Sequence, residues 1–298
     1  MTSYEIKNKK YVNDNARIDG KIVIITGCNT GIGKATALEL AKRGGKIYFA
    51  CRNEEATMEA LNEIKESTKN EQLYFLKLDL ASFDSIREFS RKFHELETRL
   101  DILINNAGVL SPLKRTAAGF ELNFGVNHLG HFLLTNLLLD SIKASAPSRI
   151  VVMSSSSHEM GSIDKNNINS ENHFPGILKA YGNSKLCNVL FMKELSKRLE
   201  GTGVVCNALG PGRIQTEAFR YLHPALKFFI RPSLKYIAAT PEVGCQTSVM
   251  LAVEPSLVEV SGCYYDKCLK IEPTIKGPED DQLWLWEMSE KLTGLNGH

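Results

Sequence analysis

The chain has 298 residues, of which 43% are hydrophobic and 23% are charged, and its formal net charge is +2. This composition is typical of a globular protein and gives no reason to expect a nucleic acid as partner. No stretch approaches the ~20 consecutive apolar residues of a membrane-spanning helix. The seven cysteines lack metal-ligand spacing, so we expect reduced, mostly buried thiols and no metal site.

The N-terminal segment 1–19 is polar and lacks the apolar core of a secretory signal. We interpret it as a flexible leader that precedes one domain over residues 20–298. Its lysines, Lys7, Lys9 and Lys10, would also suit an anionic membrane surface, so peripheral membrane contact stays open as an alternative. We expect a cytoplasmic protein that is not secreted.

Short apolar runs alternate with amphipathic segments from residue 21 onward. The runs predict strands at 21–26, 46–51, 72–78, 101–105, 149–154, 203–209 and 261–265. The amphipathic segments predict helices at about 31–43, 53–69, 83–97, 118–145 and 179–200. This alternation indicates βαβ units and therefore an α/β fold of the Rossmann type. We expect a doubly wound parallel sheet of about seven strands, covered by helices on both faces.

A glycine-rich string, TGCNTGIG at 26–33, lies between the first predicted strand and the first predicted helix. Glycine allows a tight turn and a close approach of the backbone to a pyrophosphate, which the helix N-terminus attracts. A simple turn is the alternative, but the strand and helix on either side favour a dinucleotide site. We place this part of the site on Gly27, Asn29, Thr30, Gly31, Ile32 and Gly33.

The second predicted strand ends at Cys51 and is followed by Arg52, where an NAD-binding site usually has an acidic residue. A guanidinium there would bind the additional phosphate of NADP, which a carboxylate would repel. The pattern therefore predicts NADP(H), with a solvated surface arginine as the alternative. Lys34 is a weaker candidate for the same phosphate.

Two further polar turns follow the third and fourth predicted strands. Asp79 and Leu80 would lie beside the adenine, although a helix N-cap region would look similar. The string NNAG at 105–108 contributes Asn106, Ala107 and Gly108, which would lie along the cofactor unless they form an ordinary polar turn.

Tyr181 and Lys185 are four residues apart on a predicted helix and therefore lie on one face of it. A lysine ammonium near a phenol favours the phenolate, so we expect Lys185 to lower the pKa of Tyr181 toward the range of acid–base catalysis. By itself, a tyrosine and a lysine at this spacing would more often have no catalytic role. It gains weight from the serine run at 154–157, whose hydroxyls could bind a substrate carbonyl, and from Asn127, which could hold a water.

The string PGRIQT at 211–216 follows the sixth predicted strand. The Ile214 backbone and Thr216 would bind a carboxamide there, and Pro211 and Gly212 would belong to the same cofactor site. His128 and His131 have no partner at a useful spacing, and we interpret them as structural.

Together these strings resemble the short-chain dehydrogenase/reductase family, from about Lys21 to Leu295, in the subtype with T-G-x-x-x-G-x-G. Within that family the chain is similar to the retinol dehydrogenase group. The strings that carry this closer likeness are ITGCNTGIGKATALELAKRG, ACRN, LDLAS, LINNAGV, GVNHLGHFLLTNLLL, APSRIV, SKLCNVLF and LWEMSEKLTGL.

The resemblance implies a role for each member of a catalytic set. Tyr181 would be the acid in reduction and the base in oxidation, and Lys185 would bind the nicotinamide ribose and lower the pKa of Tyr181. Ser155 would polarise the substrate oxygen, with Ser154 and Ser156 as alternatives. Asn127 would hold the water of a proton relay.

The chain also departs from the family pattern. Cys28 replaces a common alanine, Val152 stands where asparagine is frequent, and Gly210 replaces the histidine of a His-Pro-Gly string. Relatives often carry an apolar N-terminal anchor, and we expect none here because residues 1–19 are polar.

These observations predict an NADP(H)-dependent oxidoreductase, a carbonyl reductase or alcohol dehydrogenase, that interconverts a small lipophilic alcohol and its aldehyde or ketone. A substrate like retinol or retinal is favoured. Steroid or other ketones are the alternative within the family, and a non-catalytic NADP-binding sensor is the alternative outside it. The apolar and basic segment 219–237 would form a substrate lid or a membrane contact, or a helix pair packed on the core. The sequence leaves the oligomeric state and the direction of the reaction open.

Overall fold

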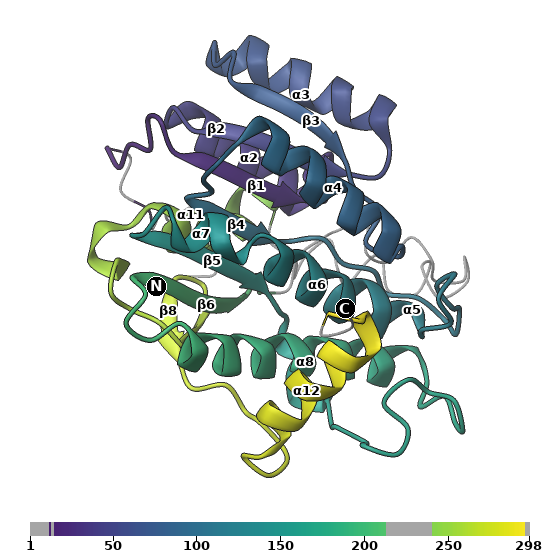
Figure 1. Ribbon diagram of the computed structural model, residues 1–298. Helices are drawn as coiled ribbons and strands as arrows, with labels where there is room; N and C mark the ends of the chain where they lie inside the picture. The colour runs from purple at the N-terminus through teal and green to yellow at the C-terminus, as the bar shows by residue number, and fades with distance from the viewer. Residues whose placement is uncertain (1–11, 13–14, 213–239, 296–298) are drawn as a thin grey trace.

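The computed structural model of the chain describes residue 12 and residues 15–212 and 240–295 (Figure 1). The predicted site residues Ile214 and Thr216 and the segment 219–237 lie outside the described residues.

An eight-stranded sheet forms the centre of the molecule, in the order β3-β2-β1-β4-β5-β6-β7-β8 (Figure 1). Its strands are β1 (Ile22–Thr26), β2 (Lys46–Cys51), β3 (Leu73–Lys77), β4 (Ile102–Asn105), β5 (Ser148–Met153), β6 (Val204–Gly210), β7 (Tyr264–Asp266) and β8 (Leu269–Ile271). The first seven run parallel, while β8 pairs antiparallel with β7 at the edge. The predicted α/β fold is confirmed, with one edge strand more than expected.

The helices described in residues 15–212 and 240–295 follow the predicted alternation. They are α2 (Gly31–Lys42), α3 (Glu54–Thr68), α4 (Phe83–Leu96), α5 (Leu122–Phe124), the π-helix η1 (Gly125–Leu129), α6 (Gly130–Leu137), α7 (Leu139–Lys143), the 3-10 helix η2 (Ser156–Met160), α8 (Ile177–Arg198), α10 (Pro241–Gly244), α11 (Gln246–Val253), the 3-10 helix η4 (Pro255–Leu257) and α12 (Asp281–Thr293). The sequence predicted neither α12 nor the pair α10 and α11.

The long helix expected over 118–145 is divided into four pieces, so that prediction was wrong. The helical segment begins only after Glu121, whose carboxylate accepts hydrogen bonds from the amides of Asn123 and Phe124. A π-turn over Gly125–Leu129 then changes the helix register. At its end the backbone of Gly130 passes so close to Leu80 that a Cβ there would lie 2.5 Å from the Leu80 carbonyl oxygen.

Both faces of the sheet are covered by helices, as β1 shows. All five residues of β1 are buried. Ile22 and Ile24 face a core layer with residues of α4, α6, α8 and α12. Val23 and Ile25 face the opposite layer, with residues of α2, α3 and α11. A central parallel strand that is buried on both faces explains the continuous apolar run in the sequence.

The packed structure begins before Gly20. Ala16 and Ile18 are buried in the layer that contains α2, and the Ile18 amide donates to the Arg43 carbonyl oxygen at 3.0 Å. The division into a leader over 1–19 and one domain over 20–298 stays a prediction.

Candidate active site

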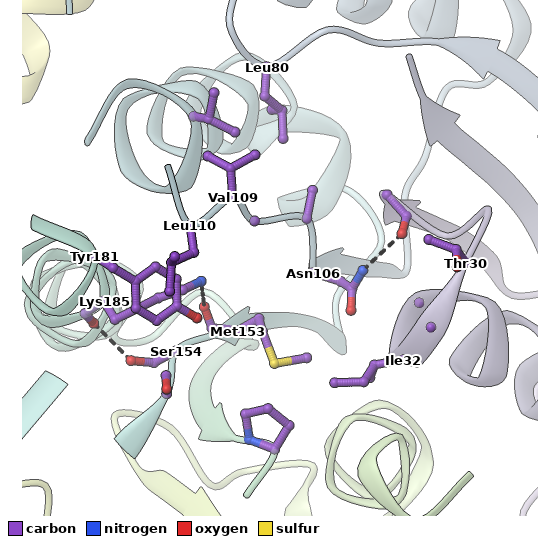
Figure 2. Close-up of a pocket in the computed structure, with 18 of the residues that line it drawn as sticks. Thr30, Ile32, Leu80, Asn106, Val109, Leu110, Met153, Ser154, Tyr181 and Lys185 are labelled. Carbon is purple, nitrogen blue, oxygen red and sulfur yellow. Dashed lines mark hydrogen bonds between the residues drawn. The ribbon is translucent and has the colours of Figure 1, made fainter. Parts of the chain in front are cut away.

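A cavity of about 800 Å³ opens where β1, β2, β4, β5 and β6 end. The strand order reverses between β1 and β4, and ligands of open α/β sheets lie at such a reversal. The predicted site residues that line this cavity are Gly27, Asn29, Thr30, Gly31, Ile32, Gly33, Arg52, Asp79, Leu80, Asn106, Ala107, Gly108, Ser155, Tyr181, Lys185, Pro211 and Gly212. In Figure 2, Asn106 lies between Tyr181 and Lys185 on one side and Thr30 and Ile32 on the other.

In the glycine-rich turn after β1, the positions of Gly27 and Gly33 are packed too tightly to hold a side chain. Gly27 has a φ of +63°, and a Cβ there would lie 2.9 Å from the Cβ of Ala107. A Cβ at Gly33 would lie 2.5 Å from the Gly27 carbonyl oxygen. These contacts bring the turn, the start of α2 and the loop after β4 together into one backbone surface.

The N-terminus of α2 is left available to a ligand. Asn53 and Ser82 cap α3 and α4 with side-chain hydrogen bonds to backbone amides, but Thr30 makes no such bond to α2. The first turn of α2 also has no acidic residue. Because exposed amides and the helix dipole attract anions, this end of the cavity fits a pyrophosphate.

Charged side chains lie at the rim beside β2 and β3. Arg52 is 60% exposed in its side chain, and its Nη1 lies 4.0 Å from Oδ2 of Asp79. The other oxygen of Asp79 accepts from the Ala81 amide at 3.0 Å, so this carboxylate is held in place. Lys34 forms an ion pair with Glu63 of α3. Arg52 is therefore the better placed of the two predicted phosphate ligands.

Thr26 organises the loop after β4, a role that the sequence analysis missed. Its hydroxyl oxygen accepts hydrogen bonds from the amides of Asn106 and Ala107, both at 2.9 Å. Both lone pairs are then used, so the hydroxyl hydrogen is left for an acceptor, Nε2 of His131 at 2.9 Å or the Ile104 carbonyl oxygen at 3.5 Å. Nδ1 of His131 carries a hydrogen, because it lies 3.0 Å from the Asn127 carbonyl oxygen, which can only accept.

Asn127 lies in the π-turn and does not line the cavity. Its side-chain amide donates to the carbonyl oxygen of Val109 and to the hydroxyl of Ser184, each at 2.9 Å, and its Oδ1 accepts from the Val109 amide at 2.7 Å. Both amide hydrogens are used, so only oxygen atoms of Asn127 can hold a water. Its predicted part in a proton relay is thereby limited to accepting.

Tyr181 and Lys185 share one face of α8, as their spacing predicted. Nζ of Lys185 lies 5.7 Å from the centre of the Tyr181 ring and donates to the Met153 carbonyl oxygen at 3.2 Å (Figure 2). Burial lowers the pKa of Lys185 to about 8. Burial raises the pKa of Tyr181 to about 12, opposed by a hydrogen bond with Ser155. The expected lowering of the Tyr181 pKa by Lys185 is therefore not found, because burial has the larger effect.

The serines after β5 have different environments. The Ser154 hydroxyl is buried and donates to the Lys185 carbonyl oxygen at 2.8 Å (Figure 2). Its hydrogen is therefore used in a structural hydrogen bond. The Ser155 hydroxyl accepts from the Ser157 amide at 3.2 Å and is the one bonded to Tyr181. Ser155 thus fits a substrate-binding role better than Ser154.

Apolar side chains form the remaining wall around Tyr181. Leu110, Leu122, Val126, Met160 and Leu178 all line the cavity, and the last two are largely exposed. The sequence analysis did not single them out, because they come from four separate segments.

The departure at Gly210 has a structural explanation in Tyr264 of β7. A Cβ at position 210 would lie 2.4 Å from the Tyr264 hydroxyl oxygen. That hydroxyl occupies the space that a larger residue at this position would need.

The chain matches the family model for short chain dehydrogenases over residues 21–227. The chain belongs to the short-chain dehydrogenase family. It is 50% identical over 287 residues to human "Retinol dehydrogenase 13", which covers 94% of this chain and 86% of that protein. It is 44% identical over 283 residues to mouse "Retinol dehydrogenase 11", which covers 94% of this chain and 89% of that protein.

Solved structures of other proteins share the fold. An uncharacterised protein from Mycobacterium Paratuberculosis superposes with a TM-score of 0.74 at 30% identity, covering 94% of this chain and 96% of that one. A complex of Pseudomonas aeruginosa RhlG with NADP gives a TM-score of 0.68 at 23% identity, covering 86% and 97%. As a short-chain dehydrogenase, the protein is an oxidoreductase that acts on CH–OH groups with a nicotinamide dinucleotide.

Two kinds of feature are absent from the described residues. Within residues 15–212 and 240–295, no cluster of three or more histidine, cysteine or acidic side chains could hold a metal ion. In the same part of the chain, no helix is both long and apolar enough to cross a bilayer.

Proposed function

We propose that this short-chain dehydrogenase uses NADP(H) to interconvert a lipophilic alcohol and its aldehyde or ketone, with a compound like retinal as the favoured substrate. The observation that carries the proposal is the cavity itself. It joins an uncapped helix N-terminus and Arg52 at one end to Tyr181 and an apolar wall at the other. The relatives named retinol dehydrogenases support the substrate class.

Tyr181, Ser155 and Lys185 have separate roles in the proposed reaction. When bound, the cofactor supplies or accepts the hydride. In reduction, the Tyr181 phenol donates its proton to the substrate oxygen while the Ser155 hydroxyl donates a hydrogen bond to the same atom. A phenol whose pKa is raised to about 12 stays protonated at neutral pH, which suits it as an acid. Lys185 binds the ribose of the cofactor with its ammonium group.

Arg52 determines the choice of cofactor in this proposal. Its exposed guanidinium at the end of β2 would pair with the phosphate that distinguishes NADP from NAD. The complex of RhlG with NADP shows that a protein of this fold can bind this nucleotide.

The proposal is tested with a substrate panel of retinal, steroid ketones and aliphatic aldehydes, each assayed with NADPH and NADH. Tyr181→Phe should lower kcat for the best substrate by about 10²–10⁴-fold, the usual contribution of a positioned acid. Tyr74→Phe, at an exposed tyrosine outside the cavity, is the matched control. Unchanged NADPH consumption in Tyr181→Phe would refute the mechanism, and a preference for steroid ketones would refute a compound like retinal as the favoured substrate.

A further inference from the structure

Cys28 and Cys51 form a thiol pair beside the cofactor cavity. Their Sγ atoms lie 3.8 Å apart, although 23 positions separate the residues in the chain. Cys51 ends β2, and Cys28 lies in the glycine-rich turn after β1, the neighbouring parallel strand. Both side chains are buried, with 0% and 3% exposure.

The backbone around the pair already holds the two cysteines together. The Gly27 amide donates to the Ala50 carbonyl oxygen at 2.9 Å, and the Cys28 amide donates to Sγ of Cys51 at 3.2 Å. Neighbouring strands are ~4.8 Å apart, a separation that disulfide-bonded residues also span. A bond of ~2.05 Å therefore requires side-chain rotation and a small movement of the turn, without any change in the sheet.

We propose that Cys28 and Cys51 are a site of reversible oxidation, at which a peroxide converts the two thiols to a disulfide that weakens binding of the cofactor. Cys51 lines the cavity together with the next residue, Arg52. A small oxidant can therefore reach Cys51 through the same opening that admits the cofactor. The part of the proposal that concerns NADP(H) rests on the proposed function.

The chemistry assigns different roles to the two thiols. The hydrogen bond from Cys28 outweighs burial and lowers the pKa of Cys51 to about 7, while burial raises the pKa of Cys28. The Cys51 thiolate attacks one peroxide oxygen, forming a sulfenic acid and releasing hydroxide. The Cys28 thiol then attacks the sulfenic sulfur and releases water. With hydrogen peroxide, the two sulfurs lose two electrons in total. The Cys28 thiol proton leaves in the water of the second step, and the hydroxide of the first step becomes the second water by taking up the proton that Cys51 released when it ionised.

The disulfide would disturb the parts of the site that contact phosphates. Cys28 would have to leave its contact with the Ile25 carbonyl oxygen, 3.2 Å from its Sγ. The Cys28 amide would lose the Cys51 thiolate as its hydrogen-bond acceptor. Both changes act on the turn between Gly27 and Gly33, whose packing tolerates little movement. Bound cofactor would in turn cover Cys51 and slow its oxidation.

The test treats the full-length protein with hydrogen peroxide, with and without a saturating concentration of NADPH. We expect a peptide linked through Cys28 and Cys51 in non-reducing mass spectrometry, at least a tenfold loss of NADPH affinity, recovery with dithiothreitol, and slower oxidation when NADPH is present. Cys28→Ser, which keeps a hydrogen-bond donor beside Cys51, should form no such peptide and should instead accumulate sulfenic acid at Cys51, detected with dimedone. Cys263→Ser, at a half-buried cysteine outside the cavity, should respond like the unmodified protein.

Two results would overturn the proposal: no linked peptide after treatment with peroxide, or a linked peptide with unchanged NADPH affinity. Failure of the proposed function has a different signature, since the reduced protein would then not bind NADPH before any peroxide is added. In that case the linked peptide still decides whether the thiol pair oxidises. The thermal stability of the treated protein then reports whether the turn has moved.

Discussion

His128 and His131 should make the protein lose stability at mildly acidic pH. Both are buried in the helical segment that carries Asn127. Burial lowers the pKa of His128 to about 3 and that of His131 to about 4, and the charge of Lys185 contributes to the second shift. The hydrogen bonds are consistent with these lowered pKa values, because the Thr26 hydroxyl has no lone pair free to accept from a proton on Nε2 of His131. Nδ1 of His128 likewise has no partner in the described structure.

Proton linkage gives the sign and size of the change in unfolding free energy with pH. In the unfolded chain a histidine has a pKa of about 6.5, so below this pH the unfolded state binds more protons than the folded state. The contribution to stability is thus fully present above pH 6.5 and is lost as the pH falls toward 4. Between pH 7.5 and 5 each histidine should cost about 2 kcal/mol, and the pair about 4 kcal/mol. That is a large share of a typical unfolding free energy of roughly 5–15 kcal/mol.

Urea denaturation followed by circular dichroism at pH 7.5 and pH 5 measures this loss. His128→Phe is the informative variant, because the ring stacks on Phe124 and its partner Ser289 still donates to the Leu285 carbonyl oxygen. It should remove about half of the pH dependence, whatever its stability at pH 7.5. His94→Asn, at an exposed histidine, is the control. An equal loss of stability in the unmodified protein and in His128→Phe would refute the reasoning.

Two other predictions concern the cofactor and can be checked by fluorescence titration. Arg52→Asp should reduce the preference for NADPH over NADH at least tenfold, about 1.4 kcal/mol, because a charge-assisted bond to phosphate is replaced by repulsion; equal affinities in the unmodified protein would contradict this reading. NADPH affinity should fall as the pH rises through about 8, because Lys185 is charged only below its lowered pKa. Lys185→Met should bind weakly but without this fall, whereas Tyr181→Phe should retain it. A fall that disappears in Tyr181→Phe would assign the titration to the phenol instead.

Local patterns predicted much of the fold and cavity. The apolar runs gave the first seven strands, and the string TGCNTGIG gave the turn that lines the cavity. These features depend on residues close together in the chain. The π-turn at Gly125–Leu129 was not predictable in this way, since the apolar pattern runs through it without interruption. It ends where Gly130 packs closely against Leu80, fifty positions away in the sequence.

Contacts between distant segments account for the other differences. Thr26 and His131 meet across 105 positions, and this contact links the helical segment of Asn127 to the loop after β4, whose amides donate to Thr26. Cys28 appeared in the sequence as an isolated departure from the family pattern. Its contact with Cys51 depends on the pairing of β1 with β2. Spacing alone showed which residues share a helix face, but not how far that face is buried.

Burial of the phenol explains why the sequence-based expectation for Tyr181 failed, and the burial of Lys185 suggests how the site uses binding energy. Lys185 is 2% exposed, and in the described structure its ammonium donates to one carbonyl oxygen, that of Met153. A buried cation with so few acceptors is costly, and its lowered pKa expresses this cost. Ribose hydroxyls beside Nζ would supply acceptors and restore the charge. A more firmly charged ammonium would then favour the phenolate of Tyr181, so we expect the coupling between the two residues in the enzyme with cofactor bound.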